Sequence, residues 1–234
     1  MVIADKKTVL SQGDLVVTGR LVDASNATLL ATVTHNDQSM HCIYKPIAGE
    51  RPLWDFPDGA LAHREYAAYL LSDRLGFDLV PLTLLRPGPF GEGMVQEWID
   101  IDESIDLSEF FATNNPALRS MALFDAIINN TDRKIGHLLP TPDGKLFGCD
   151  HGVTFHSHDK LRTVLWQWAG APLTGAEIEL LHRAEIAVTS EIDLRPFLTG
   201  EEVSALLTRI QKLLAQTIMP EPNPDWPAVP WPAF

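Results

Sequence analysis

The sequence predicts an α+β fold in which antiparallel strands and a single helix precede a mostly helical second half. Before residue 100, short runs of β-branched and apolar residues are separated by turn-forming segments, which is the pattern of antiparallel strands. After residue 100, the longer apolar segments repeat at the spacing of α-helices. With 234 residues, of which 45% are hydrophobic, the chain is long enough to form one domain with a substantial core.

The composition argues against several classes of protein. The chain carries 31 acidic and 18 basic residues, a net charge of −13, which disfavours nonspecific binding to nucleic acid or to an anionic membrane. No apolar run approaches the ~20 residues that span a bilayer, and the N-terminus has no signal-peptide pattern. The two cysteines, Cys42 and Cys149, form no CxxC motif. We therefore expect a cytoplasmic protein with no transmembrane segment and no nucleic-acid partner.

The first half of the chain is expected to hold a sheet and one helix. The first two strands form a hairpin around a six-residue loop, and the third strand ends in Lys45-Pro46. A helix follows at 61–75, where apolar residues recur at helical spacing and Gly76 provides a C-cap. Pro81 marks an edge or a bend in the next strand. The expected strands span residues 15–21, 28–33, 40–44, 78–85 and 94–99.

The second half is expected to be mostly helical. Pro116 suits the first turn of one helix, and two Thr-x-x-Glu capping boxes begin the last two. A short helix or strand is expected at 161–169. Six prolines between Pro220 and Phe234 exclude a helix there, and we expect this tail to pack as an extended strap. The expected helices span residues 116–128, 174–187 and 199–214.

Residues 123–155 carry the side chains best suited to chemistry. An apolar helix ends in a polar cluster, and a Pro-Asp-Gly turn then predicts a β-hairpin that leads to Asp150. Folding of this hairpin brings Asp132, His137 and Asp150 together. Two carboxylates and a third ligand suit a hard divalent cation, and they also suit phosphoryl transfer. Three nearby histidines lack the spacing of a zinc site, so we expect a mobile loop there. They are His151, His156 and His158.

The segments NNTDRKIGHLL and FGCDHGVTF resemble the catalytic and metal loops of the phosphatidylinositol 3-/4-kinase-like superfamily. The nearest forms are the type II phosphatidylinositol 4-kinases and the HipA-type bacterial kinases. The resemblance covers roughly residues 15–170 and implies one two-lobed, protein-kinase-like domain over 1–234. The small nucleotide-binding lobe would span about 1–99 and the helical catalytic lobe about 100–220, followed by a Pro/Trp-rich tail at 221–234.

The resemblance also implies roles for residues around the hairpin. Asp132 would be the catalytic-loop aspartate that orients the acceptor hydroxyl, and Arg133 would either stabilise developing charge or tether the loop. Asp150 and His137 would hold a divalent metal, with His137 standing where the family has an asparagine. Because imidazole favours softer ions than magnesium, either manganese is tolerated or activity is weakened. Asp125 would brace the catalytic loop through hydrogen bonds.

The resemblance places the nucleotide site in the first half of the chain. The lysine that ends the third strand would contact the α- and β-phosphates and would pair with a glutamate on the following helix. The loop of the first hairpin would contact the phosphates, and backbone groups at the end of the fifth strand would bind adenine. The residues expected to contact nucleotide are Ser25, Asn26, Lys45, Glu65, Glu97 and Ile99.

The function expected from these features is transfer of a phosphoryl group from ATP to a hydroxyl acceptor, assisted by Mg²⁺ or Mn²⁺. The acidic charge favours a small molecule or a protein Ser/Thr as the acceptor over a membrane lipid. Three alternatives stay open: a nucleotide-binding pseudokinase or scaffold, transfer of AMP, and a metal-dependent hydrolase. The hydrolase would use Asp132, His137, Asp150 and His151.

Overall fold

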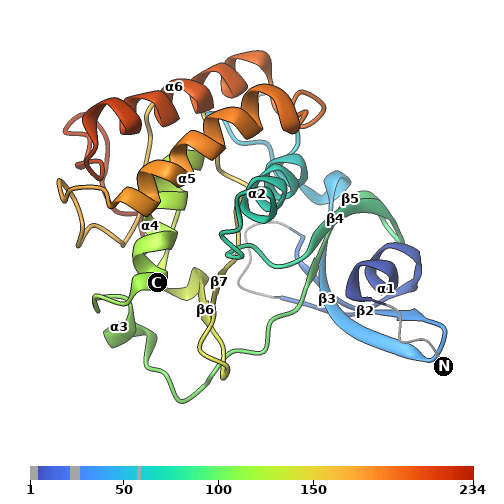
Figure 1. The fold of residues 1–234 in the computed structure, drawn as a ribbon. Helices are drawn as coiled ribbons and strands as arrows, with labels where there is room; N and C mark the ends of the chain where they lie inside the picture. The colour runs from blue at the N-terminus through green and yellow to red at the C-terminus, as the bar shows by residue number, and fades with distance from the viewer. Residues whose placement is uncertain (1–4, 22–26, 57–58) are drawn as a thin grey trace.

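The computed structural model describes residues 5–21, 27–56 and 59–234. A five-stranded antiparallel sheet in the order β1-β2-β3-β5-β4 and a two-stranded hairpin, β6-β7, form the β structure (Figure 1). The strands are β1 (Asp14–Arg20), β2 (Leu29–His35), β3 (Gln38–Pro46), β4 (Thr83–Gly88), β5 (Gly91–Glu97), β6 (Leu138–Pro140) and β7 (Leu146–Gly148). The α-helices are α1 (Lys6–Gln12), α2 (Leu61–Leu75), α3 (Leu107–Phe110), α4 (Pro116–Ile128), α5 (Gly175–Ile186) and α6 (Gly200–Gln216).

The large sheet and the α4, α5 and α6 helices lie on opposite sides of the molecule, with α2 between them (Figure 1). This arrangement confirms the mixed α and β composition with an antiparallel sheet, but the first half holds two helices, α1 and α2, where one was expected. Among the described residues, no helix is long and apolar enough to cross a membrane.

The expected strands of the first half are confirmed in part. The first hairpin and the third strand form as predicted, and Gly76 caps α2 in the left-handed conformation with φ 71°. The fourth strand begins at Thr83, not at residue 78, because Asp78 has φ 52° and Pro81 has no N–H for a ladder. The fifth strand is displaced toward the N-terminus, since a tight turn brings Gly91 opposite Gly88.

One face of the sheet is covered by α1, a helix that sequence analysis missed. Val9 and Leu10 of α1 pack with the buried side chains of Cys42 and Tyr44 on β3. Because successive side chains of a strand point to opposite faces, Lys45 lies on the other face of the sheet from Tyr44. The hydrophobic packing of α1 on β3 therefore directs the lysine away from the small core.

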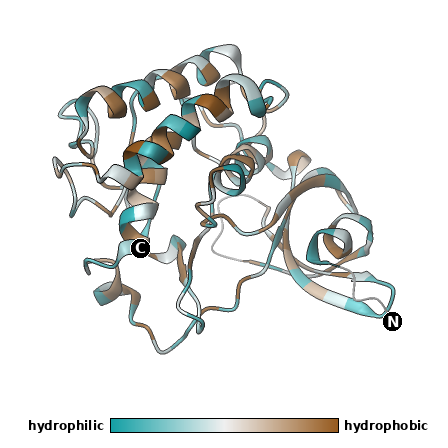
Figure 2. Cartoon of the chain, in the orientation of Figure 1, coloured by the Kyte–Doolittle hydropathy of each residue, from teal (hydrophilic) through white to brown (hydrophobic). Residues whose placement is uncertain are grey.

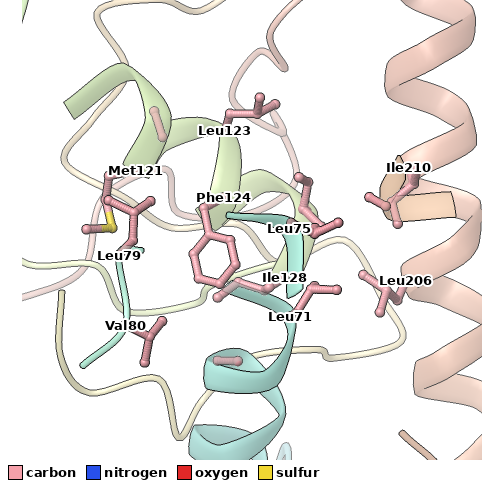
Figure 3. Close-up of a cluster of buried hydrophobic side chains, with 14 of the residues drawn as sticks. Leu71, Leu75, Leu79, Val80, Met121, Leu123, Phe124, Ile128, Leu206 and Ile210 are labelled. Atoms are coloured by element: carbon pink, nitrogen blue, oxygen red, sulfur yellow. The ribbon is translucent and has the colours of Figure 1, made fainter. Parts of the chain in front are cut away.

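The larger hydrophobic core joins α2, α4, α5 and α6. Phe124 of α4 is fully buried, and Leu71 and Leu75 of α2 lie beside it (Figure 3). Leu206 and Ile210 of α6 point into the same cluster (Figure 3). Hydrophobic and hydrophilic residues alternate around α6, as expected for a helix with one buried side (Figure 2). This core holds α2 and α4, the two helices from which the candidate site is built.

The predicted helices of the second half are confirmed, and capping boxes begin both α5 and α6. The β6-β7 hairpin also forms as predicted. The prediction of a helix or strand at 161–169 is wrong: only Thr163 makes a β-bridge, to Arg133. The backbone there bonds to the loop after α4, with Arg162 N–H donating to the Asn130 carbonyl (2.9 Å), so it adopts neither regular form. The tail after residue 220 contains no helix, as expected, but its backbone is irregular, with a turn and several bends, and is not extended throughout.

Candidate functional site

Four of the residues singled out from the sequence line one pocket of about 350 Å³. They are Lys45, Glu65, Asp132 and Asp150. The rest of the lining comes from Ala27, from the end of β3 and the segment that follows it, from the start of α2 and from Gly152 and Val153. Segments far apart in the sequence therefore meet at a pocket lined by six charged residues, because Glu50 and Arg51 also line it.

Lys45 is held at the centre of an ion-pair cluster. Its Nζ donates to Glu65 Oε1 (2.6 Å) on α2 and to Asp150 Oδ1 (2.9 Å) after β7. Burial opposes the charged form of Lys45, but the Asp150 and Glu65 carboxylates raise its pKa above the ordinary value. Lys45 is therefore an ammonium at neutral pH. Burial raises the pKa of Glu65, although Lys45 and a backbone N–H favour its charged form.

A buried network holds the loop that follows α4. The Arg133 guanidinium, which is fully buried, donates from Nε to Asp125 Oδ2 (3.0 Å) and from Nη2 to Asp125 Oδ1 (2.9 Å). Asn130 Nδ2 donates to the same Oδ1 (2.9 Å), and Arg133 Nη1 donates to the Cys149 carbonyl (3.0 Å). Because Arg133 has no exposed surface, the structure favours its role as a tether over contact with a substrate. Asp125 braces the loop, as expected.

His151 connects this network to α2. Arg133 Nη2 lies 2.7 Å from His151 Nε2, and a guanidinium only donates, so the neutral imidazole carries its proton on Nδ1. Among the described residues, Nδ1 has no hydrogen-bond partner and lies 3.9 Å from Glu65 Oε2. Burial lowers the pKa of His151 well below its ordinary value. Its backbone N–H donates to Glu65 Oε2 (2.9 Å). His151 is therefore a neutral buried group whose Nε2 is already engaged.

Asp132 lies at the same pocket, one residue before Arg133. Its N–H donates to Asn130 Oδ1 (3.0 Å), which fixes the turn. Its carboxylate is 3.4 Å from Lys134 Nζ and is about one quarter exposed. Burial raises the pKa of Asp132, while Lys134 lowers it. Asp132 is thus a partly exposed carboxylate beside Asp150, available to a molecule in the pocket.

Asp150 and His137 face each other across the base of the hairpin. Asp150 has φ 60°, a left-handed conformation in which aspartate is among the better tolerated residues. Its Oδ2 lies 3.7 Å from His137 Nε2. The Lys45 ammonium lowers the pKa of Asp150 well below its usual range, and burial lowers the pKa of His137 to about 4. At neutral pH a carboxylate therefore faces a neutral imidazole.

The described residues include no cluster of three or more His, Cys, Asp or Glu that could hold a metal ion. A metal at this site would therefore have Asp150 and His137 as protein ligands. Magnesium and related ions are commonly held by one or two protein groups, with phosphate oxygens and water completing the shell. The donor set fits such a shared ion.

Two other residues expected to contact nucleotide, Glu97 and Ile99, do not line this pocket. The Glu97 carboxylate pairs with Lys6 of α1, and its N–H donates to the Leu82 carbonyl (2.8 Å). Ile99 lies beyond the end of β5, and its role in binding adenine stays a prediction. The two phosphate contacts expected in the first hairpin loop lie outside the described residues. They are Ser25 and Asn26.

Glu50 is a site residue that sequence reasoning missed. Its carboxylate accepts hydrogen bonds from the first two N–H groups of α2, those of Leu61 and Ala62 (2.8 Å each). The sequence contained a hint of this role. Ala60, which precedes α2, has no side chain that can cap a helix, so the cap had to come from another residue. Glu50 therefore replaces the missing cap and fixes the start of the helix that carries Glu65.

Together, the fold and the pocket define an α+β protein in which a sheet lysine pairs with a helix glutamate and a loop aspartate. No family model matches the chain. It is 42% identical over 267 aligned positions to Protein Rv2133c of Mycobacterium tuberculosis (strain ATCC 25618 / H37Rv), an alignment that covers 98% of this chain and 96% of that protein. The chain therefore belongs to the same family as Protein Rv2133c.

A comparison with solved structures matches the chain to the crystal structure of a Helicobacter pylori proinflammatory kinase, CtkA. The superposition has a TM-score of 0.48 with 12% sequence identity, and it covers 90% of this chain and 94% of that one.

Proposed function

We propose that this protein is a metal-assisted phosphotransferase that transfers a phosphoryl group from ATP to a hydroxyl group of an acceptor. The observation that carries the proposal is the position of Lys45, whose Nζ bonds to both Glu65 and Asp150 at the pocket that also holds Asp132. In phosphoryl transfer, a lysine so paired contacts the nucleotide phosphates while separate aspartates serve the metal and the acceptor. On this proposal the sheet with α2 is the nucleotide-binding lobe and the remainder is the catalytic lobe.

Each group at the pocket has a distinct task in this reaction. Lys45 neutralises phosphate charge, and Glu65 keeps it extended toward the pocket. Asp132 orients the acceptor hydroxyl and accepts its proton. Burial raises the pKa of Asp132, which brings this base closer to the operating pH and strengthens it. Arg133 takes no part in the transfer and keeps the loop in place.

Asp150 and His137 would hold the divalent ion, Mg²⁺ or Mn²⁺. When bound, the ion neutralises charge on the phosphates during transfer. The Lys134 N–H lies 3.4 Å from His137 Nδ1, which leaves the proton of the neutral ring on Nε2, toward Asp150. Metal binding through Nε2 would therefore require the other tautomer, with the proton on Nδ1 and the contact from the Lys134 N–H given up. Because imidazole is a softer ligand than an amide oxygen, we expect manganese to bind more tightly than magnesium.

The acceptor is expected to be a small molecule or a protein Ser/Thr. The net charge of −13 opposes docking on an anionic membrane, where a lipid kinase has to work.

A nucleotide-binding protein without transferase activity is the second candidate. It is favoured by the imidazole of His137, because replacement of the usual asparagine ligand can reduce turnover while the Lys45 and Glu65 contacts still bind phosphates. A metal-dependent hydrolase is less well supported. Its fourth ligand would be His151, whose Nε2 is buried against Arg133.

Thermal stability with nucleotide tests the proposal. The purified protein is heated with ATP and Mg²⁺, with ATP and Mn²⁺, and with ATP alone; ligand at about 100 times its dissociation constant stabilises by roughly 2.7 kcal/mol. Lys45→Met should abolish the shift, whereas Lys145→Met, an exposed lysine on the β6-β7 turn, should keep it. Asp150→Ala should lose only the metal-dependent part. Asp159→Ala is its control, because the two side chains are similarly exposed at 54% and 49%.

The outcomes separate the candidates. A metal-dependent shift together with phosphate transfer to an acceptor supports the phosphotransferase. A shift that ignores the metal favours the nucleotide-binding protein without transfer. No shift with any nucleotide would reject both and leave the hydrolase.

A further inference from the structure

The tail, defined here as residues 220–234, contacts two segments that lie next to the Asp132 loop. It packs against the short 3₁₀ helix Ile135–His137 and against residues 159–166. Its prolines restrict the backbone and reduce the number of conformations that the tail gives up on ordering. A segment so placed can act on the geometry of the site although it lines none of the pocket.

The first contact is at the 3₁₀ helix. The Ile135 N–H donates to the Ala233 carbonyl (2.9 Å). The Phe234 ring lies over Gly136, close enough that a Cβ on that glycine would be 3.8 Å from the Phe234 Cδ1. His137 is the next residue. The end of the tail is therefore one residue from a proposed metal ligand.

The second contact is at the segment after the site. The Trp226 ring centre lies 5.7 Å from the Arg162 guanidinium carbon, within the range of a cation–π interaction. Arg162 Nε in turn donates to the Thr131 carbonyl (2.6 Å), the residue immediately before Asp132. This is a short chain of contacts from the tail to the proposed catalytic aspartate.

The same segment is anchored further along the tail. The Ala228 carbonyl accepts from the Thr163 N–H (3.1 Å) and from the Trp166 Nε1–H (2.8 Å). Thr163 also makes the β-bridge to Arg133. Besides the network around Asp125, the loop at 129–137 takes backbone partners from this segment and from the tail, since the Arg133 N–H donates to the Arg162 carbonyl (3.1 Å) and the Ile135 N–H to the Ala233 carbonyl.

We infer that the tail is a positioning element that holds Asp132 and His137 in the geometry needed for metal binding and transfer. The inference rests on the proposed function for the identity of the metal site. The ordering of the loop by the tail does not depend on it. Without these contacts the loop would sample other arrangements, and the two proposed metal ligands, His137 and Asp150, would no longer face each other.

Hydrogen exchange and manganese affinity, measured on the full chain, test the inference. Trp226→Ala and Phe234→Ala each remove one contact, and Trp226→Phe keeps an aromatic ring under Arg162. Trp231→Ala is the matched control, because that tryptophan is 91% exposed in the same tail. Amide exchange is followed for residues 131–137 and for α5, and Mn²⁺ binding by electron paramagnetic resonance.

We expect both alanine variants to speed exchange at 131–137 by about tenfold. Manganese binding should weaken by a similar factor, about tenfold, as for other groups that orient metal ligands. Exchange in α5 should stay unchanged. The Trp226→Phe protein should keep most of the parent protein's slow exchange at 131–137 and most of its manganese affinity. Unchanged exchange at 131–137, or exchange that rises equally in α5, would overturn the inference.

Failure of the proposed function gives a different result. If the unaltered protein binds no Mn²⁺, the metal site is wrong, yet exchange at 131–137 still decides whether the tail orders the loop. If the Trp226→Ala protein does not fold, the Phe234→Ala protein decides the question, because its ring is 64% exposed and its loss removes little buried surface.

Discussion

Replacing Asp125 by asparagine should destabilise the protein far more than the small change in shape suggests. Asp125 and Arg133 are both fully buried, and the carboxylate accepts hydrogen bonds from Arg133 and Asn130. Asparagine keeps the size but turns an NH₂ group toward a donor and leaves the guanidinium without a counter-charge. Removing one partner of a buried ion pair costs about 3–5 kcal/mol. We therefore expect a loss of about 3 kcal/mol or more.

Urea denaturation at neutral pH, followed by tryptophan fluorescence, measures this loss. Glu191→Gln removes one side of the exposed Arg74–Glu191 pair and is the control, with an expected change of about 1 kcal/mol or less. The Asp125→Asn protein should also lose protection at the loop after α4. A change in unfolding free energy no larger than that of the control would refute the view that this pair holds the loop.

Two further changes address the site and the sheet. His137→Asn should reduce the loss of stability in acid. The histidine is protonated below a pKa of 6.5 in the unfolded chain but only below about 4 in the folded protein, so the unfolded state gains a proton first as the pH falls. The parent protein should therefore lose about 2 kcal/mol of stability from neutral pH to pH ~5 through this residue. Urea titrations at the two pH values compare the variant with the parent, and equal losses would contradict the reasoning. Gly93→Ala should cost about 1–3 kcal/mol, because its Cβ would overlap the Lys45 carbonyl and lie 2.7 Å from Pro46 Cα. Urea denaturation measures this loss, and Gly200→Ala, whose Cβ would meet nothing within 4 Å, is the control that should cause none.

Elements with strong local signals were predictable from the sequence. Pro116 occupies the first turn of α4, Gly76 ends α2, and a Thr-Glu capping box begins α5. In each case the residues that mark the boundary also satisfy the free backbone groups of the helix, so neighbouring residues alone contain the information. The Pro-Asp-Gly turn of the β6-β7 hairpin is predictable for the same reason.

Elements held by distant partners were not predictable. The α1 helix has only seven residues, and its end is fixed by Arg86, whose guanidinium bonds to the Leu10 (2.6 Å) and Gly13 (2.9 Å) carbonyls. Helices this short are unstable alone. Residues 161–169 likewise take their conformation from the loop after α4.

For the site, residue types and the hairpin pattern identified Asp132, His137 and Asp150, and the family resemblance added Lys45 and Glu65; the structure brings these five residues close together. The orientation of the side chains around the site could not be predicted from the sequence. The burial of Arg133 and the tautomer of His151 depend on which atoms face which in three dimensions. Sequence patterns carry no such information.

The β6-β7 hairpin separates the two halves of the site along the chain and is fixed at its base and at Pro140, whose carbonyl accepts from the Asp102 N–H (2.8 Å). At the base the Gly148 N–H donates to the Leu79 carbonyl (2.7 Å) and the Cys149 N–H to the His137 carbonyl (3.1 Å). The turn at the other end, residues 141–145, contacts little beyond itself. An epitope or a fluorescent peptide inserted after Gly144 would therefore lengthen the chain between Asp132 and Asp150 without moving them. The hairpin offers a place to label this protein within its most sensitive stretch of sequence.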